Sequence, residues 1–101
     1  MTLQEREARA CAIIDSMARE LRAVSIYLHD NPELGLNEHK AVKVIHQFLE
    51  KQNFISQVGL ADMRELQTAL RADYRGNAKY KIAFLGEYDA LPELGHGCGH
   101  N

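Results

Sequence analysis

The sequence has few cysteines, no long apolar run and no apolar leader, and each lack excludes a class of protein. Its two cysteines are Cys11 and Cys98, whereas a secreted chain this short that depends on disulfide bonds carries more of them. No apolar run approaches the roughly 20 residues that a membrane span needs. Residues 1–7 are charged from the start, unlike a signal peptide. We therefore expect reduced thiols, a cytoplasmic location and no membrane partner.

The sequence also lacks an excess of either charge. It has 12 Lys and Arg against 14 Asp and Glu, a net charge of -2 at pH 7, and the two signs are interleaved. Proteins that bind nucleic acid gather basic residues on one face, so we expect no nucleic acid partner. Internal repeats, low-complexity tracts and Pro- or Ser-rich linkers are absent too. The 101 residues therefore predict one domain, or a piece of one.

Apolar residues recur at helical spacing from Leu3 to about Asp30, which predicts one long helix. The helix should end there because Asn31 precedes Pro32, and the residue before a proline avoids helical backbone angles. We expect the apolar stripe to face the core and Cys11 beside it to be buried. The stripe consists of Leu3, Ala10, Ile14, Met17, Leu21, Val24 and Leu28.

The middle of the chain predicts a second helix and two short strands. The helix should run from about Glu38 to Gln52, with Asn37 as its N-cap. Strands are predicted at Phe54–Val58 and Thr68–Tyr74, with a loop at Gly59–Met63 between them.

Tyr80–Leu85 is a nearly continuous run of aromatic and aliphatic residues that ends at Gly86. A run of this kind is typical of a central strand covered on both faces. Two helices followed by two or three strands indicate helices packed on a mixed sheet. The predicted fold class is therefore α/β, with α+β as the alternative.

The last fifteen residues carry side chains typical of a metal site. His96, Cys98 and His100 are separated by single glycines. Thiolate and imidazole are natural zinc ligands, and imidazole also binds manganese, nickel or cobalt. A zinc site needs at least three protein ligands, so this cluster should be completed from elsewhere. Glu87 and Asp89 follow the third predicted strand, where α/β folds place their ligands.

Three motifs in this order resemble the start of an amidohydrolase of peptidase family M20. They are Pro32-Glu33-Leu34-Gly35 with Glu38, then Phe84 to Pro92, then Gly95 to Asn101. The similarity covers about residues 26 to 101 and points to the branch of the aminobenzoyl-glutamate utilisation proteins and related dipeptidases. It implies a zinc-peptidase-like α/β fold and metal-dependent hydrolysis of amide bonds in dipeptides or N-acyl amino acids.

The resemblance also assigns roles to single residues. Cys98 and His100 match a pair of metal ligands in the family, and Asp89 matches the acid that orients the site, which makes it the catalytic candidate. Glu87 stands where many relatives have a metal-binding histidine, so its role stays open. His96 precedes the ligand pair and would support it. The implied cofactor is a divalent metal, zinc first, with manganese, nickel or cobalt as alternatives.

In the family, the general base and the remaining ligands lie downstream of the glycine-rich cluster. We therefore expect residues 1–101 to be the N-terminal portion of a truncated metallohydrolase catalytic domain, and to be inactive alone. The full-length form would act on a small dipeptide or N-acyl amino acid and could be a homo-oligomer. One alternative is a small non-enzymatic module that binds a metal or a partner through the same tail. Another is a peptide shared within a larger complex.

Overall fold

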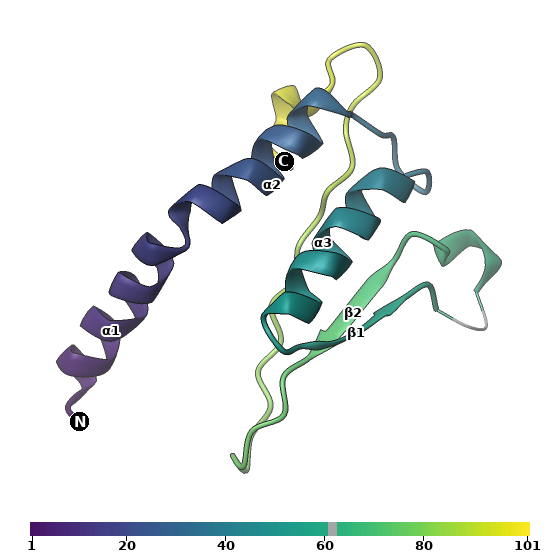
Figure 1. The fold of residues 1–101 in the computed structure, drawn as a ribbon. Helices are drawn as coiled ribbons and strands as arrows, with labels where there is room; N and C mark the ends of the chain where they lie inside the picture. Colours follow the sequence, from purple (N-terminus) through teal and green to yellow (C-terminus); the bar gives the residue numbers. More distant parts are fainter. Residues whose placement is uncertain (61–62) are drawn as a thin grey trace.

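The computed structural model describes residues 1–60 and 63–101 and shows helices first, then an antiparallel pair of strands. Figure 1 shows α1 and α2 following one another along one line, with α3 beside the strand pair. This confirms the α/β class predicted from the sequence. The elements are α1 (Leu3–Ser16), α2 (Ala18–Asp30), α3 (His39–Lys51), β1 (Ile55–Val58), η1 (Arg64–Leu66), β2 (Leu70–Asp73) and η2 (His96–Cys98).

The first predicted helix is interrupted at Met17, so the prediction of one continuous helix was wrong. Met17 has φ -97° and ψ 0°, outside the regular helical values. Just before it, the Ser16 hydroxyl donates a hydrogen bond to the Ile13 carbonyl at 2.6 Å. A serine that bonds back to the preceding turn competes with the helical ladder, which accounts for the break. The predicted end at Asp30 is confirmed.

The apolar stripe of the first two helices is mostly exposed, which corrects the prediction that it faces a core. Leu28 is buried, but Leu3, Ile14 and Leu21 are exposed. Cys11, expected to be buried, is also exposed. Within the described ranges, α1 has no buried residue. The spacing thus marked an amphipathic helix correctly, but burial also needs a second surface to cover the stripe.

The small core lies where α2, α3 and the last part of the chain meet. Its buried apolar residues are Leu28, Ala41, Val42 and Ala90. On its other side α3 packs against β1 and β2. The ring of His46 on α3 lies 2.8 Å from the Ser56 hydroxyl on β1.

The strands β1 and β2 pair in an antiparallel register in which Ile55 faces Asp73 and Val58 faces Leu70. Both predicted strands are therefore confirmed, each within the predicted limits. The turn between them includes η1. The predicted loop at Gly59–Met63 includes residues 61–62, which lie outside the described residues.

The third predicted strand, Tyr80–Leu85, is not a strand in the described part of the chain, and its side chains are exposed. Phe84 is 94% exposed and Leu85 is 99% exposed. Figure 1 shows this segment running back from the hairpin past α3 as an irregular ribbon. A central strand needs a hydrogen-bonded neighbour along its edges, and no described residue pairs with Tyr80–Leu85. The run is apolar as expected, but the structure leaves it uncovered.

None of the helices found in residues 1–60 and 63–101 has the length and apolar character required to span a membrane.

Candidate metal centre

The C-terminal segment is held by the turn that follows α2. The amide of Ala90 donates a hydrogen bond of 2.7 Å to the Glu33 carbonyl, and Leu34 and Ala90 form a parallel bridge. Leu91 and Gly95 then exchange two backbone hydrogen bonds, of 2.9 and 3.0 Å. Gly95 has φ +60°, a value that glycine adopts without strain. The chain therefore reverses here and returns toward α2.

The chain end lies against α2. The Asn101 side-chain amide donates to the carbonyl and the hydroxyl of Ser25, at 3.2 and 3.0 Å. In Figure 1 the C-terminus lies beside α2, next to the short η2 turn. These two contacts, at Ala90 and at Asn101, bring the segment that carries the predicted site residues against the helical layer.

Three ionisable side chains meet in this segment: Glu87, Asp89 and His100. His100 Nδ1 lies 2.9 Å from Asp89 Oδ1, and His100 Nε2 lies 3.5 Å from Glu87 Oε2. One ligand atom from each of the three lies within 4.8 Å of the others. The His100 and Asp89 side chains are about one third exposed, and the Glu87 side chain is more exposed. A small ligand could therefore reach the cluster from solvent.

The contact between Asp89 and His100 shifts both groups toward their charged forms. The hydrogen bond from His100 lowers the pKa of Asp89 below its ordinary value. The same hydrogen bond, together with the negative charges of Asp89 and Glu87, raises the pKa of His100. Because an ionised carboxylate can only accept hydrogen bonds, the ring proton facing Asp89 is on Nδ1.

This tautomer leaves a place for a cation. When His100 is neutral, its Nε2 carries a lone pair that faces the Glu87 carboxylate across 3.5 Å. Two acceptors at this distance repel one another unless a proton or a metal ion lies between them. Tetrahedral zinc, with bonds of about 2.0–2.1 Å, separates neighbouring ligand atoms by about 3.3 Å. A carboxylate on the far ring nitrogen is also common where histidine binds a metal. The donor set therefore fits a divalent metal.

The other two predicted residues of the cluster lie close by but make different contacts. Cys98 is partly buried, and its thiol faces the Asp89 carbonyl at a sulfur–oxygen distance of 3.7 Å. His96 is buried, with 6% of its surface exposed, and its Nδ1 has no hydrogen-bond partner among the described residues. His96–Cys98 forms the 3-10 turn η2, so the side chains of this segment do not alternate as they would in an extended chain.

The structure also shows a supporting role for Glu33 that the sequence did not reveal. Its carboxylate accepts hydrogen bonds from the amides of Lys40 and Ala41, at the start of α3. The predicted N-cap, Asn37, was wrong: the cap position is Glu38, and its side chain makes no capping bond. An acid in the turn before a helix was the available signal, but capping patterns place it within three residues of the helix start.

A second set of contacts connects the site segment to the strand layer. Tyr88, next to Asp89, donates its hydroxyl to the Thr68 carbonyl, and the Thr68 hydroxyl donates to Glu38 at 2.9 Å. Burial raises the pKa of the Tyr88 hydroxyl, which therefore stays protonated as a donor. Tyr88 and Ala90 thus hold Asp89 from both sides along the chain.

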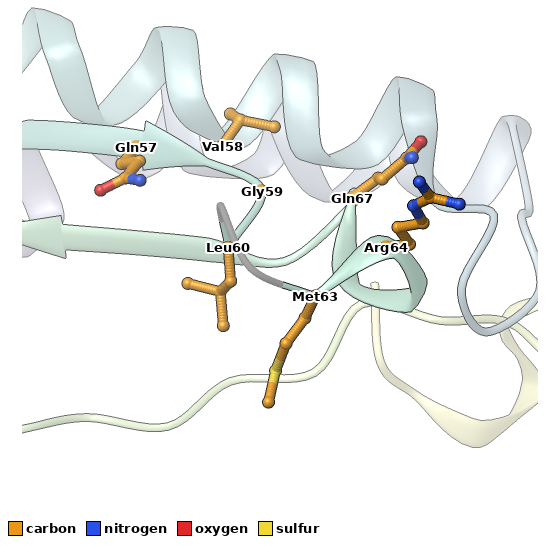
Figure 2. Close-up of a pocket in the computed structure, with 7 residues that line it drawn as sticks. All are labelled: Gln57, Val58, Gly59, Leu60, Met63, Arg64 and Gln67. Carbon is orange, nitrogen blue, oxygen red and sulfur yellow. The ribbon is translucent and has the colours of Figure 1, made fainter.

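A separate hollow of about 360 Å³ lies between β1 and η1. Figure 2 shows Arg64 and Gln67 at one end of it, with Leu60 and Met63 along the lower side. Of the seven residues that line it, Arg64 alone is ionisable, and none belongs to the cluster of Glu87, Asp89 and His100. Among the described residues, the lining of this hollow therefore carries no carboxylate, imidazole or thiol.

Comparison of the sequence with known proteins relates the chain to a protein family. The chain is 37% identical to the Xaa-Arg dipeptidase of Mus musculus and 33% identical to that of Homo sapiens, in each case over 98% of its length. It is also 35% identical to an uncharacterised hydrolase of Staphylococcus haemolyticus over 74% of its length. The chain belongs to peptidase family M20.

This M20 chain spans about a quarter of the length of the two dipeptidases, 24% and 25%. It covers 22% of the staphylococcal hydrolase. No family model matches the chain. The similarity confirms the family predicted from the three motifs, and the names of these M20 relatives support hydrolysis as the family role.

Proposed function

We propose that the chain supplies part of the metal centre of an M20 amide hydrolase that acts on dipeptides or N-acyl amino acids. The observation that carries the proposal is the convergence of Glu87, Asp89 and His100 on one point of the chain. Two relatives named Xaa-Arg dipeptidase make dipeptides that end in arginine the first substrates to test. Residues 1–101 are then the N-terminal portion of the catalytic domain.

In this proposal, His100 and Cys98 bind the metal. Asp89 is the catalytic-site carboxylate that orients the metal-binding histidine. Asp89 holds the Nδ1 proton of His100, which turns the Nε2 lone pair toward the metal position. Glu87 faces that position from the other side and is a third candidate ligand. Zinc suits the thiolate and imidazole pair, and manganese, nickel and cobalt are the alternatives. A metal held there would polarise an amide carbonyl. It would also lower the pKa of water, which could then lose a proton and attack the carbonyl carbon.

Residues 1–101 alone are expected to be inactive, because metal-assisted hydrolysis also needs a group that takes the proton from water. Asp89 is engaged with His100 and is therefore a poor choice for that role. The whole protein would supply the base and the remaining ligands, act on its substrate in the cytoplasm and could assemble as a homo-oligomer.

The test compares a longer protein that contains this chain with residues 1–101 alone. We expect the longer protein to hydrolyse Xaa-Arg dipeptides and to lose at least a hundredfold in kcat/KM on Cys98→Ala or His100→Ala. Cys11→Ala is the matched control, because Cys11 is exposed on α1. Full activity of both site variants would refute the assigned roles, and metal-dependent hydrolysis by residues 1–101 alone would refute the need for a further base.

The second candidate function is a non-enzymatic module that binds a metal through the same cluster. It is favoured by the fact that all three converging side chains belong to one short segment, Glu87 to His100. This reading predicts tight, stoichiometric zinc binding by residues 1–101 and a melting temperature that rises with zinc. Stoichiometric binding combined with a longer protein that lacks hydrolase activity would favour the module over the enzyme.

A further inference from the structure

The turn after α2 contacts both the helix that follows it and the residue next to Asp89. We infer that Glu33 is a positioning residue for the Asp89–His100 pair. Its carboxylate is fixed by the start of α3, and its backbone fixes Ala90. The effect of Glu33 on metal binding rests on the proposed function. The positioning of Asp89 and His100 by Glu33 does not depend on that function.

The side chain of Glu33 is held by α3. Its Oε1 accepts from the Lys40 amide at 2.9 Å and from the Ala41 amide at 2.8 Å, and its Oε2 lies 3.0 Å from the Lys40 amide. The first amides of a helix have no partner within the helix, and the helix dipole favours a negative charge there. Ala41 is 2% exposed, so water does not readily replace this cap.

The backbone of Glu33 is held to the site. Its carbonyl accepts from the Ala90 amide at 2.7 Å, and the next residue, Leu34, forms the bridge to Ala90. Ala90 is 3% exposed. A Cβ built on Gly35 would lie 3.8 Å from Asp89 Oδ2, so the turn also lies beside the carboxylate itself.

These contacts form a short path from α3 to Asp89 through one residue. A shift of the Glu33 backbone moves Ala90 with it, and Asp89 is covalently attached to Ala90. The bond between Asp89 and His100 depends on a distance of 2.9 Å and weakens when either partner moves. Loss of the Glu33 carboxylate should therefore disturb His100 although the two side chains are not hydrogen-bonded to each other.

The test variant is Glu33→Gln, which keeps the shape but turns one acceptor oxygen into a donor that faces the α3 amides. Thr2→Ala is the matched control. The Thr2 hydroxyl accepts from the Glu5 amide at 3.1 Å as part of a capping box, so this change also removes a helix cap. It acts on α1, which contributes no residue to the site.

Lys40→Pro is the second variant. It removes the Lys40 amide, which is one of the two donors to the Glu33 carboxylate, and proline is tolerated in the first turn of a helix.

The readout is the tautomer of His100 in metal-free residues 1–101, measured by long-range 15N–1H NMR above the pKa of the ring. We expect the Nδ1–H form in the parent chain and in Thr2→Ala, and a mixture of tautomers in Glu33→Gln and Lys40→Pro. An unchanged Nδ1–H form in both of the last two variants would overturn the inference. Equal loss in Thr2→Ala would also overturn it, because the effect would then be one of general stability.

Zinc titration separates this inference from the proposed function. If the parent chain binds zinc, we expect Glu33→Gln to weaken its zinc affinity by about tenfold or more, as substitutions of residues that orient metal ligands commonly do. The zinc affinity of Thr2→Ala should equal that of the parent chain. If the parent chain does not bind zinc while the tautomer still responds to Glu33→Gln, the positioning role stands and the metal site fails.

Discussion

His100 Nδ1 lies 2.9 Å from Asp89 Oδ1, and this one contact favours the charged form of the histidine and fixes the tautomer and the direction of its neutral ring. The two residues are eleven positions apart, and the chain between them reverses at Leu91–Gly95 to bring them together. The Nε2 atom then faces Glu87. A histidine with one nitrogen paired to a carboxylate and the other directed at an acid is suited to hold a cation.

The pH dependence of this pair is the first prediction. The raised pKa of His100 stabilises the fold below the ordinary histidine value of 6.5, and this contribution is lost as pH rises through the raised pKa. The lowered pKa of Asp89 stabilises the fold above the ordinary value of 3.8, and this contribution is lost as pH falls through the lowered pKa. The pair should therefore stabilise the chain most between these two ordinary values.

Asp89→Asn tests this window. Without the carboxylate charge, the pKa of His100 measured by NMR titration should fall toward its ordinary value. The ring chemical shifts of exposed His29 on α2, recorded in the same samples, are the internal control. A His100 pKa that does not change in Asp89→Asn would show that the two side chains do not meet in solution.

The second prediction distinguishes the candidate ligands with Co²⁺ as a spectroscopic probe. Thiolate ligation gives a charge-transfer band in the near ultraviolet. We expect this band in the parent chain and its loss in Cys98→Ser, while Glu87→Gln should keep the band and weaken Co²⁺ binding. Cys11→Ser, which changes the other, exposed cysteine, should alter neither. A band that survives Cys98→Ser would remove Cys98 from the ligand set.

The third prediction concerns the exposed run Tyr80–Leu85. Uncovered apolar side chains on an irregular segment with unpaired backbone groups favour association between chains. Phe84→Lys should therefore lower the self-association of residues 1–101, measured by light scattering at increasing concentration. Ile14→Lys is a suitable control because Ile14 is also exposed, at 57%, but lies on a helix whose backbone is already paired. Equal effects of both changes would mean that general hydrophobicity, rather than the unpaired segment, drives association.

The fourth prediction concerns His96. A buried polar atom without a partner costs about 1–3 kcal/mol, and the Nδ1 of His96 is such an atom among the described residues. His96→Leu removes it and keeps a side chain of similar volume. The free energy of unfolding of the metal-free chain, from urea titration, should therefore stay the same or rise by about 1 kcal/mol. A clear loss of stability would mean that Nδ1 has a partner in solution, such as a bound water.

Local signals in the sequence were sufficient for the helices and the short strands. The end of α2 before Pro32, the limits of α3 and the positions of β1 and β2 follow from proline sterics and from apolar periodicity, which act within a few residues. Periodicity could not place Leu3 or Ile14 in a core, because burial depends on a second surface. It also could not make Tyr80–Leu85 a strand, because a strand needs a paired neighbour.

The same distinction applies to the site. The sequence by itself determined the family, since the order of three motifs carries that signal, and it determined which residue types stand near Asp89 and His100. The tertiary structure alone decided that Asp89 binds the Nδ1 side of the ring, that Glu87 faces the Nε2 side and that Glu33 connects this segment to α3. These contacts depend on where the chain reverses and on what it packs against. Local sequence patterns therefore cannot predict which residues remote in sequence come together.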